Sequence, residues 1–203
     1  MSPIRIVPSG DYIRVTADLT IEAGVEVQFG AGKGIDMAGQ CSQLIMNGNE
    51  SNEPDGRITV SNIGGSTSAN GKGFAFTRGC STTTDRHTFE NVDFSNLDIA
   101  ISAGSRHGNS PHYNGDVGDF NFDDVTFTDV GTAIKHGSGQ YSSFDLSGVS
   151  ITNATNSCIS LPDYASLNWN TGSMTNCNQG SSSSDGAIMT GYGSEVTLND
   201  ISI

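Results

Sequence analysis

Apolar and polar residues alternate in short runs along much of this chain, which is the pattern of β-strands that bury one face. Four aligned segments share one order: a large apolar residue, a Val or Gly three positions later, and an apolar residue two positions after that. They are residues 89–94, 122–127, 146–151 and 169–174. Ser, Thr and Asp occupy the outward positions. The pattern predicts an all-β chain.

A four-residue motif occurs five times: an apolar residue, Ser or Thr, Asn or Asp, and then usually another apolar residue. Its Asn/Asp members are separated by 34, 33, 24 and 23 residues; they are Asn62, Asn96, Asp129, Asn153 and Asn176. Short strands, sharp turns and a repeat of this length are typical of the rungs of a parallel β-helix, a solenoid of stacked coils. The two longer separations predict about 10 residues looped out of those rungs.

The repeated Asn/Asp position has a physical reason in such a stack. Equivalent residues of successive rungs lie about 4.8 Å apart, so their side-chain amides can form hydrogen bonds along a ladder. Asn also tolerates the left-handed backbone that a tight bend requires. We therefore expect an amide ladder, against the alternative of turn-favouring Asn residues scattered by chance.

No linker, charge block or change of composition divides the 203 residues, so we expect one domain over 1–203. Residues 1–40 would hold the first strands and a Gly-rich turn, and residues 58–203 the rungs that carry the ladder. At about 24 residues per rung the chain makes about eight rungs. Residues 196–203 stop partway through a rung, so we expect a piece of a longer chain.

The chain has 22 acidic and 9 basic residues and a net charge of −13. This charge excludes nucleic acid as a favoured partner and disfavours an anionic membrane surface. We find neither an apolar run long enough to span a bilayer nor an N-terminal signal peptide, so the chain is either cytosolic or has lost its targeting segment. Acidity with abundant Ser, Thr, Asn and Gly suits an extracellular surface, although simple solubility explains it equally well.

The chain contains four cysteines: Cys41, Cys80, Cys158 and Cys177. Their spacings are not those of zinc fingers. In an exported protein they would form two disulfides, Cys158–Cys177 and Cys41–Cys80. Buried free thiols are the alternative, because Cys158 and Cys177 fall in columns of small or apolar residues.

The N-terminal third resembles a known family. Residues 12–15 read Tyr-Ile-Arg-Val, residues 18–29 contain Leu-Thr-Ile-Glu-Ala-Gly-Val-Glu-Val-Gln-Phe, and a Gly-rich turn follows at 30–35. This order resembles the opening of microbial surface β-helix proteins. The later segments with a small residue and Ile resemble the right-handed parallel β-helix repeats of adhesins and autotransporter-type passengers. The resemblance implies this fold, which hosts lyases, hydrolases, tailspikes and adhesins alike.

A polysaccharide lyase on this fold would need a base and cationic groups near a uronate. Basic pairs follow two of the rungs, and an acid follows a third, at about the same turn; the candidates are Lys135, His136, Arg106, His107 and Asp163. No complete pectate-lyase constellation is present. An ordinary polar loop edge is the alternative interpretation.

Two further candidate sites rest on side-chain type. Acidic residues in and after the long insertion could hold Ca²⁺ through oxygen ligands: Asp116, Asp119, Asp123 and Asp124. Outward hydroxyls resemble the faces of β-solenoid ice-binding proteins, with Thr126, Thr128, Thr152 and Thr175 as the candidates. Ordinary solvation and β-propensity explain both groups as well.

The sequence therefore favours a non-catalytic extracellular or cell-surface segment, adhesive or structural, that binds glycans or another surface protein through its loops. We expect this segment to need no cofactor, with Ca²⁺ as the one candidate ion. A carbohydrate-active enzyme is the main alternative, and ice binding is a more distant one. Glycan-stacking aromatics would strengthen the first hypothesis, but the tyrosines are scattered through predicted turns.

Overall fold

The structure is a computed structural model that describes residues 4–6, 12–50, 56–63, 72–77, 86–104, 116–137, 141–178 and 186–203. These residues form seventeen strands and no helix. Ten strands make sheet A: β1 Ile4–Ile6, β3 Leu19–Glu22, β4 Glu26–Phe29, β6 Leu44–Asn47, β7 Ile58–Asn62, β9 Arg86–Ser95, β11 Asp116–Thr128, β13 Tyr141–Thr152, β15 Ala165–Thr175 and β17 Glu195–Ser202. Seven make sheet B: β2 Tyr12–Val15, β5 Gly34–Met37, β8 Phe74–Phe76, β10 Ile99–Ala103, β12 Thr132–His136, β14 Ile159–Asp163 and β16 Ile188–Tyr192.

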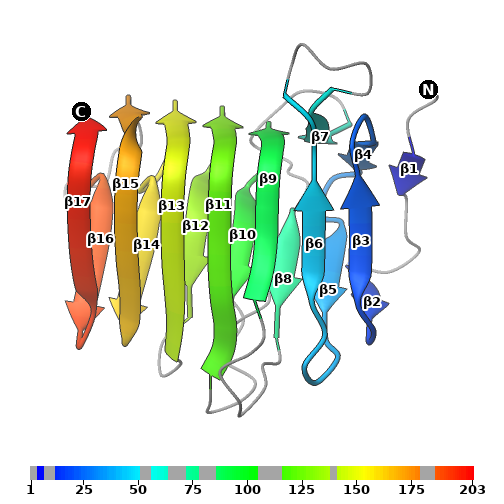
Figure 1. Cartoon of the computed structure of the whole chain (residues 1–203), viewed down its shortest axis with the longest axis horizontal. Coiled ribbons are helices and arrows are strands. Elements are labelled where there is room, and N and C mark those ends of the chain that lie inside the picture. Colours follow the sequence, from blue (N-terminus) through cyan, green and yellow to red (C-terminus); the bar gives the residue numbers. More distant parts are fainter. Residues whose placement is uncertain are drawn as a thin grey trace.

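The chain passes from sheet B to sheet A and back again, and the two sheets face each other along the length of the molecule (Figure 1). Every paired strand lies parallel to its neighbour, so the chain returns in the same direction after each circuit. The all-β, parallel part of the prediction is confirmed. Sheet B has seven strands in the described ranges, and β1 pairs with β4 in sheet A.

The long strands of sheet A each turn a corner at a residue with positive φ. These residues occupy one register position: Asn91, Asp124, Gly148, Thr171 and Asp200. Strand β6 pairs with β9 before the corner, and β7 pairs with β9 after it. Sheet A therefore has a first flank and a second flank, and with sheet B they enclose the interior on three sides.

The predicted amide ladder lies just beyond the second flank. Asn96, Asp129, Asn153 and Asn176 all have positive φ, at 55°, 53°, 58° and 55°. Asn153 Nδ2 donates to Asp129 Oδ1 at 2.9 Å, and Asn176 Nδ2 donates to Asn153 Oδ1 at 3.0 Å. Asn62 stands in the same register without a positive φ. The ladder is confirmed over Asp129, Asn153 and Asn176.

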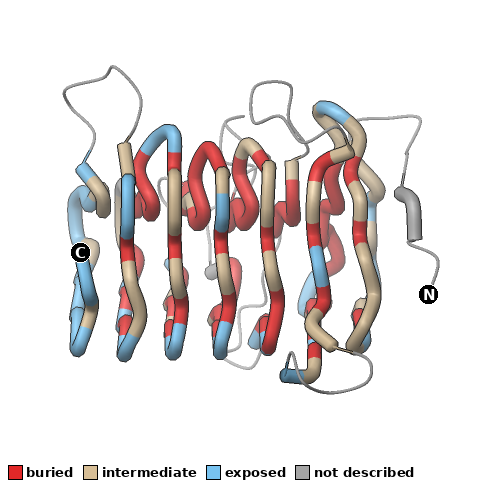
Figure 2. Tube along the Cα trace, turned by 90° about the horizontal axis from the view of Figure 1, so that it is seen from above, coloured by how far each residue is buried: buried red, intermediate tan, exposed pale blue. Residues whose placement is uncertain are grey.

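Buried residues recur at matching places in successive strands (Figure 2), and their apolar side chains pack into one core cluster. Phe89 stacks on Phe122 with 4.6 Å between ring centroids, and Phe94 stacks on Phe127 with 5.0 Å. Trp169 continues the Phe122 column and is fully buried. Burying rings of this size contributes about 2–3 kcal/mol each, which offsets the low apolar content of the chain.

The sequence left disulfides and buried free thiols open as alternatives, and the structure shows three of the four cysteines disulfide-bonded. Cys158 and Cys177 form a disulfide, with 5.3 Å between their Cα atoms. Cys41 is also disulfide-bonded, and Cys80, its predicted partner, lies outside the described residues. In that same part of the chain, no helix is long and apolar enough to cross a membrane.

Candidate functional site

Three tyrosines gather on one edge of the molecule, and we call them the tyrosine corner: Tyr141, Tyr164 and Tyr192. The rings of Tyr141 and Tyr164 have centroids 5.1 Å apart at an angle of 40°, and those of Tyr164 and Tyr192 lie 5.5 Å apart at 86°. Tyr141 is 59% exposed and Tyr192 is 75% exposed. A stack of aromatic rings left open to solvent is a feature of binding sites. The sequence had indicated scattered tyrosines, and this is wrong for Tyr141, Tyr164 and Tyr192; Tyr113 lies outside the described residues.

The register of the strands builds this corner. Tyr141 and Tyr164 each directly precede one of the paired residues Ser142 and Ala165, so their rings come from the same place in successive circuits. The Tyr164 N–H donates to the Tyr192 carbonyl at 3.0 Å, which joins the third circuit. Gly193 lies under the Tyr164 ring, because a Cβ atom there would be 2.8 Å from Tyr164 Cδ1. A larger residue at 193 would displace the ring.

An open hollow of about 310 Å³ lies beside the rings of Tyr141 and Tyr164. Its polar lining comes from Ser142, Ser143, Ser166, Asp119 and Glu195. The Ser143 hydroxyl donates to a carboxylate oxygen of Asp119. The hollow thus joins aromatic faces to hydroxyl groups and carboxylates, and its only charged lining residues among the described ones are acidic.

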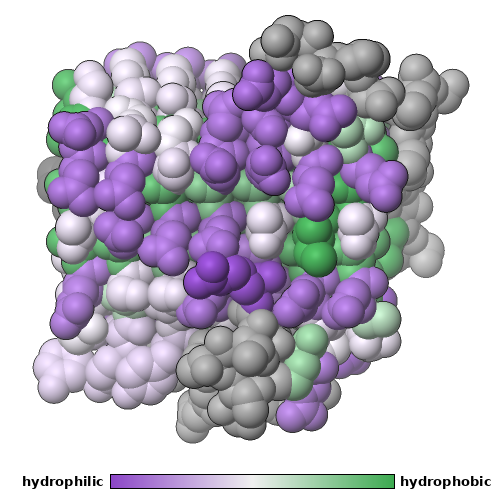
Figure 3. All heavy atoms as spheres, viewed as in Figure 1, coloured by the Kyte–Doolittle hydropathy of each residue, from purple (hydrophilic) through white to green (hydrophobic). Residues whose placement is uncertain are grey.

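A second hollow of about 460 Å³ lies on the first flank, where hydrophilic side chains cover much of the face seen in Figure 3. Acids and amides line it, including Glu90, Asp123, Asp145, Asn168 and Asn170. Asn168 Nδ2 lies 3.4 Å from Asp145 Oδ1, and Asn199 Nδ2 donates to Asn170 Oδ1 at 2.8 Å. Its polar groups are partly used in contacts between neighbouring strands.

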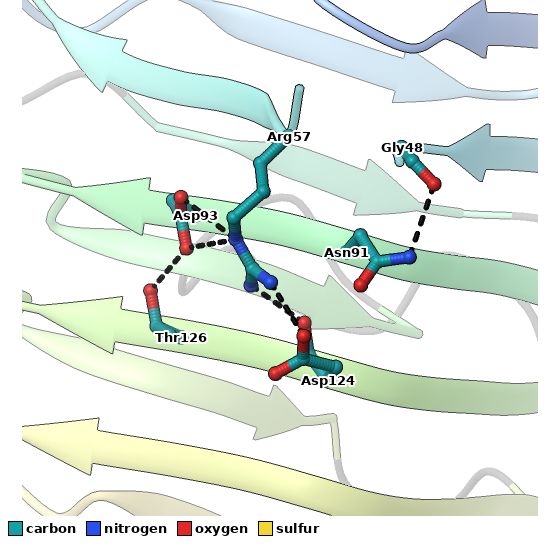
Figure 4. Close-up of polar contacts among 6 residues, drawn as sticks. All are labelled: Gly48, Arg57, Asn91, Asp93, Asp124 and Thr126. Carbon is teal, nitrogen blue, oxygen red and sulfur yellow. Dashed lines mark hydrogen bonds and ion pairs between the residues drawn. The ribbon is translucent and has the colours of Figure 1, made fainter. Parts of the chain in front are cut away.

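Arg57, just before β7, forms an ion-pair cluster with two aspartates that the sequence did not predict (Figure 4). Arg57 Nε lies 2.9 Å from Asp93 Oδ1, and Arg57 Nη1 lies 2.6 Å from Asp124 Oδ2. Thr126 Oγ1 also donates to Asp93 Oδ1 at 2.7 Å. The Arg57 side chain is only 13% exposed. Its donors are engaged, so this cluster ties β7, β9 and β11 together rather than offering a site.

The candidate base His136 lies in the interior. It is fully buried and packs edge-on against Phe144, with 6.1 Å between ring centroids. Desolvation on burial lowers the pKa of His136 to about 4, and Asp163 only partly opposes this. Lys135 is adjacent in β12 and half-buried on the outward side. The structure therefore does not bring these two side chains to one surface, and Arg106 and His107 lie outside the described residues.

A second buried histidine, His87, sits in an aromatic column. Its ring lies 4.4 Å from that of Phe76 and 4.8 Å from that of Phe120, and its Nδ1 accepts a hydrogen bond from the Leu44 N–H at 3.1 Å. Desolvation lowers the pKa of His87 to about 4, while the Val117 backbone and Asp119 oppose the shift. Both histidines are neutral core residues at neutral pH.

The predicted Ca²⁺ ligands lie apart from one another. Asp119 and Asp123 are four residues apart on the first flank, while Asp124 is at the corner and bound to Arg57. The side chain of Asp116 is not described. Within the described ranges, no three His, Cys, Asp or Glu side chains are placed to hold a metal ion.

The predicted hydroxyl face takes shape on the second flank. Thr128, Thr152 and Thr175 occupy one register column, and Thr126, Ser150 and Ser173 occupy the next. The Thr126 hydroxyl is engaged by Asp93, and Ser173 donates to Ser150 at 3.2 Å. Asp93 interrupts the second column. Ice binding by this face stays a prediction.

Comparison with known proteins adds no relative to this picture. The chain matches no protein-family model, and no curated protein or solved structure shows significant similarity to it. Function is therefore inferred from the geometry of the tyrosine corner.

Proposed function

We propose that this chain is a right-handed parallel β-helix segment of a microbial surface protein and that it binds glycans, without catalysis, at the tyrosine corner. The observation that carries the proposal is the cluster of Tyr141, Tyr164 and Tyr192, of which Tyr141 and Tyr192 are exposed, beside a hollow lined by hydroxyls and carboxylates. Circuits of parallel strands in constant register support the β-helix.

Glycans match this arrangement because a sugar ring has an apolar C–H face and a rim of hydroxyl groups. Tyrosine rings offer flat apolar area to the sugar face at a low cost in side-chain entropy. Asp119 and Glu195 accept hydrogen bonds from sugar hydroxyls, and such charge-assisted bonds are stronger than those between neutral groups. A concave site with a few convergent polar groups is the usual form of a small-ligand site.

Two features support an extracellular or cell-surface location. The Cys158–Cys177 disulfide and the bonded state of Cys41 suit an oxidising compartment. The net charge of −13 keeps such a surface soluble and free of nucleic acid. The family assignment to adhesins or autotransporter-type passengers remains part of this proposal.

A panel of labelled oligosaccharides tests the binding function. We expect at least one glycan to bind, and Tyr141→Ala to weaken it about tenfold or more, equivalent to about 1.4 kcal/mol. Tyr12→Ala is the matched control, because Tyr12 lies in β2 at the far end of the molecule (Figure 1). If Tyr141→Ala and Tyr192→Ala both bind the glycan with unchanged affinity, the assignment of the binding site to the tyrosine corner is overturned.

The same incubations test the enzyme alternative. We expect every bound glycan to be recovered intact. Release of unsaturated or shortened products that is lost in Lys135→Ala would contradict the non-catalytic part of the proposal and would point to the outward side of β12.

A further inference from the structure

The acidic groups of the hollow belong to one straight column of side chains. Asp119 on β11 pairs with Ser143 on β13, Ser143 with Ser166 on β15, and Ser166 with Glu195 on β17. Asp119 and Glu195 are therefore three strand spacings apart, about 14 Å. Asp119 and Glu195 bracket a serine hydroxyl on each of the two strands between them, and Arg86 on β9 pairs with Asp119 beyond the hollow.

The tyrosine corner runs beside this column in the same direction. Tyr141 and Tyr164 come from successive circuits and line the same hollow as the column. Tyr192 continues the row of rings toward β17. Together the two rows make a track along the long axis, with aromatic faces on one side and acids and hydroxyls on the other.

The charge of the track discriminates among glycans. Its charged lining residues are both carboxylates, and the whole chain carries a net charge of −13. Uronate and sulfate groups would be repelled, whereas an ammonium group is attracted by the carboxylates and by the faces of the tyrosine rings. Neutral sugars would gain the stacking contacts and the hydroxyl hydrogen bonds but not the attraction between an ammonium group and the carboxylates.

We infer that the track binds amino-sugar glycans with free, protonated amines, such as oligomers of 2-amino-2-deoxyhexose, laid along the long axis from Asp119 to Glu195. The inference rests on the proposed glycan-binding function and deepens it. The sugar faces stack on Tyr141 and Tyr164, the amines meet the carboxylates, and the sugar hydroxyls meet Ser143 and Ser166.

Calorimetric titration with three probes tests the inference at a mildly acidic pH, at which the sugar amine is protonated. The probes are a glucosamine hexamer, an N-acetylglucosamine hexamer and an oligogalacturonate. We expect the glucosamine hexamer to bind at least tenfold more tightly than its acetylated counterpart, and the oligogalacturonate to bind most weakly. Added salt should reduce this preference, because it screens the charges.

Charge-neutralising variants separate the track from general attraction between a polycation and an acidic protein. The double variant Asp119→Asn with Glu195→Gln should abolish the preference for the amine, because it lowers the affinity for the glucosamine hexamer at least tenfold more than the affinity for the acetylated hexamer. Its control is Asp145→Asn with Glu90→Gln, which removes the same number of charges from the second hollow. That control should retain the preference.

Each result decides between the claims. Equal binding of both hexamers to the unaltered protein refutes amine recognition while the glycan-binding function stands. A preference that persists in the Asp119 and Glu195 variant, or falls equally in the control variant, refutes the track as its source. If tetramethylammonium binds tightly and none of the glycans binds, the track is a small-cation site and the glycan claim is overturned. Failure of every glycan in the wider panel to bind refutes both proposals.

Discussion

Replacing Asn153 tests whether the amide ladder stabilises the stack. Asn153 donates to Asp129 at 2.9 Å and accepts from Asn176 at 3.0 Å, and its backbone has a φ of 58°. Asn153→Gly removes both side-chain hydrogen bonds but keeps a backbone suited to positive φ. Asn153→Ala removes the same bonds and also places an ordinary Cβ in a left-handed conformation.

The expected magnitudes follow from these contacts. Each lost hydrogen bond is worth about 1 kcal/mol net, because Asn153 is half-buried and its partners keep some access to water. Asn153→Gly should therefore lower the free energy of unfolding by about 2 kcal/mol. Left-handed backbone adds about 1 kcal/mol, so Asn153→Ala should lower it by about 3 kcal/mol.

Urea unfolding with the disulfides kept oxidised measures these differences. Asn168→Ala is the matched control, because Asn168 is exposed, has no positive φ and makes only a long contact of 3.4 Å to Asp145. The control should stay within about 0.5 kcal/mol of the unaltered protein. The ladder would be refuted as a stabilising element if both Asn153 variants matched this control. A glycine variant less stable than the alanine variant would refute the backbone argument.

Two further predictions concern the interior and the second flank. Burial lowers the pKa of both His87 and His136 from 6.5 to about 4. Below pH 6.5 the unfolded chain therefore binds protons that the folded chain does not. The free energy of unfolding should be highest above pH 6.5 and fall by about 3 kcal/mol for each histidine as the pH approaches 4. In urea titrations across this range, His87→Phe should reduce the loss; an unchanged pH dependence would contradict the assignment. Arg57→Met should lower stability by about 1–2 kcal/mol, since Asp93 and Asp124 lose their partner. Thermal unfolding compares this variant with Arg14→Met, in which the replaced arginine is exposed. Equal melting temperatures of the two variants would contradict a stabilising role for the Arg57 ion pairs.

Much of the fold could be predicted because successive strands repeat the same pattern of buried and polar residues. The column from Phe122 to Trp169 and the ladder from Asp129 to Asn176 are both visible as fixed spacings in the sequence. The corner within the long strands was missed, because its residues have no common type. Asp124, Gly148 and Thr171 all adopt positive φ there, and the backbone position is shared although the side chains differ.

The functional site was harder to predict, although one signal was present. Tyr141 and Tyr164 are 23 residues apart, the same separation as Asn153 and Asn176, so the ladder register already placed the two tyrosines side by side. Gly193 is the residue that aligns with Tyr164, and Tyr192 lies one position before it. The spacing in the sequence therefore does not reveal the third tyrosine. The burial of His136 could have been predicted from its place two residues after the inward-facing Ile134, because a strand turns adjacent residues to opposite faces.

Tyrosine ring resonances, followed by NMR while a glucosamine hexamer is titrated into the isotope-labelled protein, test the central claim most directly. The account predicts that the resonances of Tyr141, Tyr164 and Tyr192 shift together and saturably, while that of Tyr12 stays unchanged. Saturable binding that leaves the three corner resonances in place, or that shifts Tyr12 instead, would contradict it.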